Sequence, residues 1–256
     1  MRLLCNYSPA ILDLVRDRQL HVDGFKLSRE ETFEEDLDAI GDVGPSFLHW
    51  NHAPGDPIDW ERFGPWLRAV RQPAVNLHVT LGNDAPPDAW FETTYAAICD
   101  LKADVARQLG DGVTVIIENM PYRGEGGPRQ LLSQPSTVRE LCSRADVDLL
   151  LDVAHARVAA AGLGIPVHRY LEALPLDRAW ELHVNGPRVV NGVLTDRHEE
   201  LTDVDYELIS WLVQRSHPAQ VTLEYGGTGK PYAHQTDPDA LRRQISRLQR
   251  ILAEAA

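Results

Sequence analysis

The feature that most constrains this fold is an alternation of eight short apolar runs with segments of helical pattern. The apolar runs are residues 2–6, 22–27, 46–50, 74–81, 113–119, 147–153, 179–185 and 220–225. Helical patterns follow these runs at residues 9–18, 29–40, 59–70, 87–109, 136–143, 203–215 and 238–255. After the sixth run, short helical pieces extend up to residue 174. Strands that alternate with helices favour a parallel sheet, and nearly continuous apolar runs suit strands buried on both faces. The pattern predicts one α/β domain over residues 1–256, a closed (β/α)8 barrel, with an open doubly wound sheet as the alternative.

Side chains that commonly bind metals stand at the ends of these runs. The third to eighth runs close on a histidine or a carboxylate, one further histidine follows on a turn, and an Asp-x-His pair lies on a loop. The full set is His49, His78, Glu118, Asp152, His155, His183, Asp196, His198 and Glu224. The carboxyl ends of barrel strands meet at one mouth, where such barrels hold their active sites. A cluster of this kind would be strongly repulsive without cations, so the sequence predicts a metal-dependent enzyme with more than one ion. Iron, zinc and manganese all accept these ligands.

Other candidates supplement this set. His52 lies three residues beyond His49 and could replace it as a ligand. Lys26 ends the second run and is expected to contact an anionic substrate, while Glu118 and Glu224 are candidates for proton transfer or for bridging two ions. The asparagines at strand ends are expected to orient substrate or ligands, namely Asn6, Asn119 and Asn185. Residues 225–230 lack the first glycine of a P-loop, and residues 123–128 form a candidate lid.

Composition narrows the expected partners. A net charge of −13 argues against binding a phosphate backbone, and no apolar run approaches the ~20 residues of a membrane span. The first residues show none of the features of a signal peptide, so we expect a cytoplasmic protein. Three distant cysteines are expected to be buried free thiols, namely Cys5, Cys99 and Cys142. The expected partner is a small-molecule or peptide substrate rather than nucleic acid or membrane, with a homo-oligomer left open.

Several motifs resemble a known superfamily along nearly the whole chain. They are Ile-Glu-Asn-Met-Pro at 117–121, Leu-Asp-Val-Ala-His at 151–155, Glu-Leu-His-Val-Asn-Gly at 181–186, Asp-Arg-His at 196–198 and Leu-Glu at 223–224. These motifs resemble the xylose-isomerase-like TIM barrels, which include sugar isomerases and epimerases, endonuclease IV and the DUF692 group of multinuclear non-heme iron oxidases. The opening Cys-Asn-Tyr-Ser-Pro at 5–9 and the compact length look most like DUF692-related proteins.

This resemblance implies roles for the candidate ligands. In its trinuclear branches one metal would take His49, His78 and Glu118, a second would take Glu118, Asp152, His183 and Glu224, and a third would take His155, Asp196 and His198. DUF692-like members oxidise or rearrange cysteine-containing peptides and similar small substrates with iron and dioxygen. Many of them carry Asn where this chain has His155, a departure that leans towards the isomerase or endonuclease pattern.

Four hypotheses follow. The first is an oxidase with two or three irons that acts on a small-molecule or peptide substrate. The second is a divalent-metal isomerase or epimerase of sugars or sugar phosphates, in which Glu118 and Glu224 move protons. The third is a zinc phosphodiester hydrolase like endonuclease IV, which the net charge opposes. The fourth is a metal-binding barrel without catalytic activity.

Overall fold

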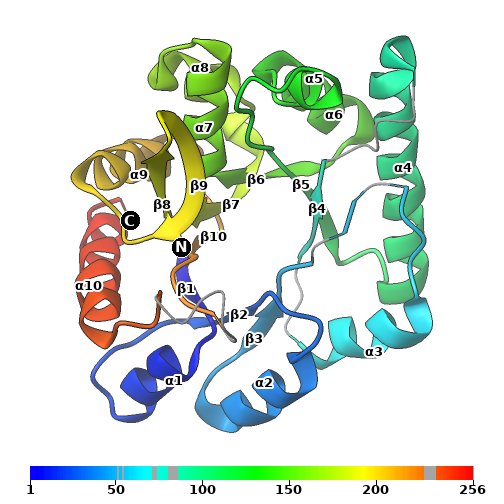
Figure 1. Cartoon of the computed structure of the whole chain (residues 1–256). Coiled ribbons are helices and arrows are strands. Elements are labelled where there is room, and N and C mark those ends of the chain that lie inside the picture. Colours follow the sequence, from blue (N-terminus) through cyan, green and yellow to red (C-terminus); the bar gives the residue numbers. More distant parts are fainter. Residues whose placement is uncertain (51, 54, 71–73, 80–85, 228–234, 256) are drawn as a thin grey trace.

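The structure is a computed structural model that describes residues 1–50, 52–53, 55–70, 74–79, 86–227 and 235–255. Eight parallel strands form a nearly closed barrel with helices around its outside, a (β/α)8 TIM barrel (Figure 1). The strand order is β3-β2-β1-β10-β7-β6-β5-β4. The strands are β1 Arg2–Asn6, β2 Gly24–Leu27, β3 Ser46–Leu48, β4 Ala74–His78, β5 Thr114–Glu118, β6 Asp148–Asp152, β7 Ala179–Val184 and β10 Gln220–Leu223. The predicted fold class is confirmed.

Helices occupy the segments between the strands. They are α1 Pro9–Arg16, α2 Phe33–Ile40, α3 Trp60–Ala69, α4 Trp90–Leu109, α5 Pro128–Leu132, α6 Pro135–Ala145, α7 Val153–Leu163, α8 Val167–Ala173, α9 Asp203–Ser216 and α10 Pro238–Glu254. Short 3-10 turns cover Gly41–Val43, Pro87–Ala89 and Leu176–Arg178. None of the helices in the described ranges has both the length and the apolar character needed to cross a membrane.

A side chain joins the two ends of the strand order. The Asn76 side chain, on β4, accepts a hydrogen bond from Trp50 N at 2.9 Å and donates one to Trp50 O at 3.1 Å. His78 N also donates to His52 O at 3.0 Å. The segment after β3 is therefore held against β4 by an amide group that imitates the backbone ladder, and this contact brings His49 beside His78.

Strand alternation separates the barrel interior from the helix-facing core. Because successive side chains point to opposite faces, residues two apart along a strand share the inside of the barrel. Ile116 and Leu150 form a small apolar cluster with Ala74 and Trp180, separate from the large cluster beneath the helices. Two residues further along their strands come Glu118 and Asp152. The interior thus changes from apolar to ionisable towards the carboxyl ends of the strands.

Local hydrogen bonds fix the turns that carry functional residues. Ser8 accepts a hydrogen bond from Ile11 N and caps α1, which begins with Pro9 as helices often do. Asp152 ends β6 and also caps α7, since its Oδ1 accepts a hydrogen bond from His155 N at 2.7 Å. The strand therefore passes directly into the helix, and His155 lies in the first helical turn beside the carboxylate that ends the strand.

The structure corrects several boundaries and one loop. β2 begins at Gly24 rather than at residue 22, β3 ends at Leu48, and α2 begins at Phe33 rather than at residue 29. Residues 80 and 81 of the expected fourth run lie outside the described residues. The segment expected as a loop around the Asp-x-His pair is an antiparallel hairpin of β8 Gly186–Val190 and β9 Val193–Glu199. All three cysteines are free as expected, but Cys99 is only half-buried.

Candidate metal centre

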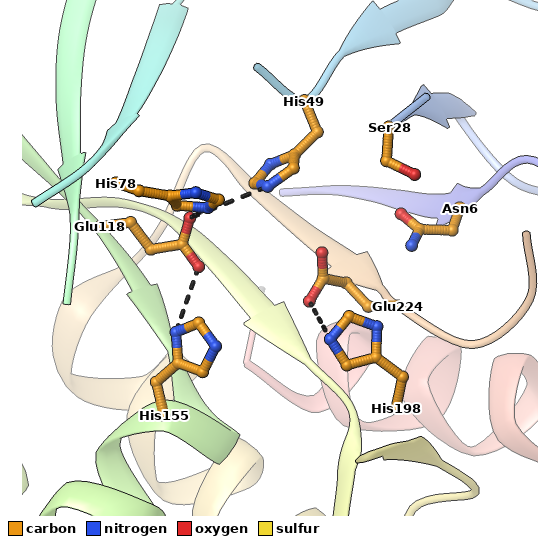
Figure 2. A pocket seen from close by; sticks show the side chains of 8 residues that line it. All are labelled: Asn6, Ser28, His49, His78, Glu118, His155, His198 and Glu224. Carbon is orange, nitrogen blue, oxygen red and sulfur yellow. Dashed lines mark ion pairs between the residues drawn. The ribbon is translucent and has the colours of Figure 1, made fainter. Parts of the chain in front are cut away.

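Glu118 is the contact point of three histidines at the barrel mouth. His78 and Glu118 are register partners at the ends of β4 and β5, and His78 Nε2 lies 2.7 Å from Glu118 Oε2. His49, just beyond β3, places Nε2 3.9 Å from the same oxygen. The other oxygen, Oε1, lies 3.3 Å from Nδ1 of His155 (Figure 2). The two oxygens of one buried carboxylate therefore face different histidines, which is the arrangement that a bridging carboxylate requires.

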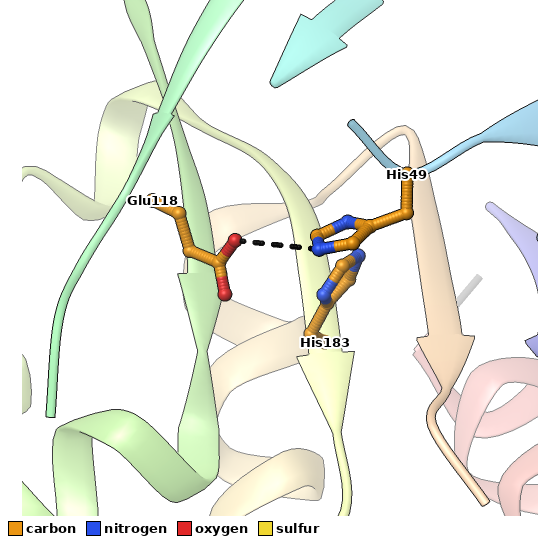
Figure 3. Close-up of side chains that lie close together, drawn as sticks. All are labelled: His49, Glu118 and His183. Carbon is orange, nitrogen blue, oxygen red and sulfur yellow. Dashed lines mark ion pairs between the residues drawn. The ribbon is translucent and has the colours of Figure 1, made fainter. Parts of the chain in front are cut away.

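A second group forms where β6, β7 and β10 end. Asp152 and His183 are register partners, and Glu224 follows β10 directly. His183 Nδ1 lies 3.1 Å from Glu224 Oε1. Asn185 Nδ2 lies 3.4 Å from a carboxylate oxygen of Asp152 and 3.4 Å from one of Glu224. This group adjoins the first, because His49, Glu118 and His183 also place one ligand atom each within 4.8 Å of one another (Figure 3).

The hairpin supplies the third group. Asp196 and His198 are alternate residues of β9, and His198 Nε2 lies 3.1 Å from Asp196 Oδ2. Asp196 Oδ2 also lies 3.3 Å from Nε2 of His155. His155 Nδ1 lies 2.9 Å from the backbone oxygen of Asn119, which favours a hydrogen on Nδ1 and leaves Nε2 directed at Asp196. His198 Nε2 is 3.9 Å from Glu224, so the hairpin group connects to the second group as well.

Buried polar atoms in the cluster fit a bound cation. His183 Nδ1, Glu118 Oε2 and Asp196 Oδ1 are buried and have no hydrogen-bond partner within the described ranges. The close approaches of His183 to Glu224 and of His78 to Glu118 are not aligned as hydrogen bonds. Buried polar atoms without partners are costly, and a cation would satisfy them. Oxygen and imidazole donors without thiolate match iron, zinc or manganese.

The surroundings of the cluster shift the proton affinities of its members. Burial alone would lower the pKa of His183, but the carboxylates of Glu224 and Glu181 raise it to about 10. Burial also lowers the pKa of His198, but the contact with Asp196 outweighs this effect and raises the pKa to about 9. Burial raises the pKa of Asp152 to about 7. In the metal-free protein these ligands hold protons that a binding metal must displace.

The structure brings all nine candidate ligands into one connected cluster. It also distinguishes His49 from His52, the two histidines that the sequence left as alternative ligands. His52 is turned away, with its ring stacked on Trp50 at a centroid distance of 4.6 Å and Nε2 3.1 Å from Asp56 O. His49 lies in the cluster, where burial lowers its pKa to about 3. The assignment of individual ligands to individual metals stays a prediction.

Lys26 is not placed as the sequence suggested. Its ammonium is buried and lies 2.8 and 2.9 Å from the two oxygens of Glu181, a residue that sequence reasoning missed. Glu181 precedes His183 by two positions on β7 and therefore points to the same face, a signal that alternation offered. The cavity at the mouth is lined by Asn6, Ser28, His49, His78, Glu118, His155, His198 and Glu224. Lys26 is not among these lining residues, so an ion pair replaces the expected substrate contact.

The remaining candidates lie in the site, in the candidate lid or outside the described residues. Asn119 exchanges two hydrogen bonds with the backbone of Asp152, at 3.0 and 2.9 Å, and so fixes the strand end. Asn6 lines the cavity with a buried Oδ1 that has no hydrogen-bond partner among the described residues. In the candidate lid at 123–128, Glu125 accepts hydrogen bonds from Arg123. Residues 228–230 of the glycine-rich segment lie outside the described residues.

Curated proteins of similar sequence come from several bacteria. A UPF0276 protein of Caulobacter vibrioides is 30% identical over 146 residues, which are 56% of this chain and 50% of the relative. A UPF0276 protein of Acaryochloris marina is 32% identical over 154 residues, 59% of this chain and 54% of the relative. The chain thus spans about half the length of the curated relatives it matches.

Solved structures agree on the fold. The IOLI protein with a bound zinc atom superposes with a TM-score of 0.68 at 12% identity, covering 100% of this chain and 99% of that one. At such identity the likeness shows the barrel fold alone. The family profile of the RiPP precursor modification enzymes MbnB/TglH/ChrH matches residues 83–244. That segment includes seven of the nine clustered side chains, all except His49 and His78, and covers more than half of the sequence. The chain therefore belongs to the MbnB/TglH/ChrH family of RiPP precursor modification enzymes.

Proposed function

We propose that this protein is a multinuclear, iron-dependent oxidase whose substrate is a peptide or a small molecule. The observation that carries the proposal is the unbroken set of contacts among nine carboxylate and imidazole side chains at one barrel mouth. Family membership supports a peptide as the substrate. A single metal ion needs far fewer ligands than this cluster offers, so its size supports two or three ions.

The contacts indicate which residues would hold each ion. Glu118 would bridge the first and second ions, because its Oε2 lies 2.7 Å from His78 Nε2 and it also places a ligand atom within 4.8 Å of one of His183. Asp152, His183 and Glu224 place ligand atoms within 4.8 Å of one another and would hold a second ion. His155, Asp196 and His198 would complete a third. Bound iron would supply the one-electron and dioxygen chemistry that protein side chains lack.

The rest of the mouth would bind the substrate. Asn6 and Ser28 line the cavity on the side away from His78, Glu118 and His155 (Figure 2). The cavity volume is about 130 Å³, below the ~300–1,000 Å³ common for small-molecule pockets. A cavity of this size suits one side chain of a peptide better than a whole sugar. Asn6 Oδ1 offers an acceptor for a donor group on that substrate.

A divalent-metal isomerase or epimerase is the second candidate. It is favoured by one observation, that Glu118 and Glu224 both line the cavity and could move protons on a bound sugar. This reaction needs no dioxygen and would exchange substrate hydrogen with solvent. Dioxygen dependence therefore separates the two candidates.

Oxygen uptake tests the proposal. Iron-loaded protein, purified without oxygen, is mixed with a synthetic cysteine-containing peptide and with aldose and ketose sugars in an oxygen electrode. The proposal expects peptide-dependent oxygen consumption with a mass change in the peptide. It expects the Glu118→Gln variant to lose this uptake, while His21→Asn, at an exposed histidine far from the cluster in sequence, retains it. Solvent hydrogen exchange into a sugar without oxygen uptake would instead support the isomerase.

A further inference from the structure

Beneath the metal cluster lies a buried polar group that the proposed reaction does not use. Glu181 is 1% exposed and receives hydrogen bonds from Lys26, on β2, and from the hydroxyl of Thr222, on β10, at 2.6 Å. Its Oε1 also lies 3.2 Å from His183 Nε2. One carboxylate thus joins three strands of the barrel, and the imidazole of His183 stands between it and the cluster above.

The two nitrogens of His183 face different surroundings. Nε2 faces Glu181, whereas Nδ1 faces Glu224 at 3.1 Å, and His183 forms a group with Asp152 and Glu224. A neutral imidazole carries one hydrogen, and the hydrogen bond made by one nitrogen decides which nitrogen is free to bind metal. An acceptor at Nε2 therefore leaves the lone pair of Nδ1 directed at the cluster.

The ammonium of Lys26 explains why the Glu181 carboxylate can be buried inside the barrel. Its ammonium contacts both oxygens of Glu181, and the two side chains are 3% and 1% exposed. A buried carboxylate without a cation would be strongly disfavoured, whereas a paired one remains an acceptor with a fixed orientation. Lys26 and Glu181 then act as one unit that holds the His183 ring.

We infer that Glu181, held by Lys26, is a positioning residue that directs Nδ1 of His183 to the metal centre. This inference rests on the proposed metal site. It assigns Lys26 a role in orienting a ligand in place of the substrate contact expected from the sequence. Partners of this kind typically affect metal affinity about 10–100-fold when removed.

Two double variants of the full chain test the inference. Lys26→Met with Glu181→Leu removes the ion pair and the acceptor, and Lys26→Met with Glu181→Gln removes the ion pair but keeps an amide oxygen for Nε2–H. Both are stripped of metal and titrated with Zn²⁺ alone. We expect the leucine double variant to bind zinc about 10–100-fold more weakly at one site. The glutamine double variant should stay close to the wild-type affinity.

A spectroscopic readout supplements the titration. In zinc-loaded wild-type protein, ¹⁵N shifts of His183 should show hydrogen on Nε2 and metal on Nδ1. Equal zinc affinity in both double variants, or zinc on Nε2 of His183, would overturn the inference. If the leucine variant fails to fold, as a thermal melt would reveal, the wild-type ¹⁵N shifts decide alone. A wild-type protein that binds neither zinc nor iron would contradict the metal centre itself.

Discussion

Replacing Lys26 by methionine tests the buried ion pair through stability. Lys26 and Glu181 are almost fully buried, so solvent does not screen the pair as it would on the surface. The substitution leaves the Glu181 carboxylate buried without its cation, a change that typically costs about 3–5 kcal/mol. Thr222 still donates a hydrogen bond to Glu181 and His183 still contacts it. We therefore expect the lower end, about 3 kcal/mol, which corresponds to roughly 6–12 °C in melting temperature for a chain of this size.

Thermal unfolding followed by circular dichroism on metal-free protein measures this effect. The matched control is Arg243→Met, which removes an exposed ion pair with Glu200 and should leave the midpoint nearly unchanged. Adding Glu181→Leu to Lys26→Met should recover much of the loss, because apolar pairs often replace buried ion pairs without penalty. If Lys26→Met lowers the melting temperature no more than Arg243→Met does, the buried ion pair does not stabilise the fold as described.

Three further predictions concern the cluster. Because the fold raises the pKa values of His183 and His198, their protonation stabilises the metal-free fold fully below pH 6.5. The free energy of unfolding should therefore fall as the pH rises through about 9 to 10, and urea unfolding at a series of pH values measures it. Gly186→Ala should displace the β8–β9 hairpin, because an added Cβ would overlap the backbone oxygens of residues 199 and 200; elemental analysis should show less bound metal. His49→Asn should lower the metal content whereas His52→Asn should not, because only His49 lies in the cluster.

Each of these predictions has a clear opposite outcome. Metal-free stability that rises over that pH range would contradict the environment described for the two histidines. Gly112→Ala is the control for the glycine substitution, since a Cβ there meets nothing within 4 Å, and equal metal loss in both would deny a role for the hairpin. Loss of metal on changing His52 alone would reassign the ligand after β3.

The fold and most of the cluster followed from alternation along buried strands. Apolar runs bury both faces of a parallel sheet, and a polar residue at the end of such a run, as Glu118 and Asp152 are, must lie at the barrel mouth. The register then brings side chains of neighbouring strands together, as for His78 with Glu118. These constraints are local enough to read from one sequence.

The hairpin and the role of Glu181 were not predicted from the sequence. The hairpin was interpreted as a loop because its strands are partly exposed and charged. Its turn signal was present, since Asn191-Gly192 stands between valines and both residues have positive φ, 51° and 79°, as two-residue hairpin turns require. Glu181 was overlooked because its partner Lys26 lies 155 residues away in the sequence. Only the closed barrel brings the two together.

We propose that the nine clustered side chains form a multinuclear metal centre. Elemental analysis of protein purified without oxygen, with absorbance recorded before and after exposure to air, tests it most directly. We predict two or three iron ions per chain, an absorbance that changes with oxygen, and a lower metal content in Glu118→Gln. At most one ion per chain, unchanged by that substitution, would contradict it.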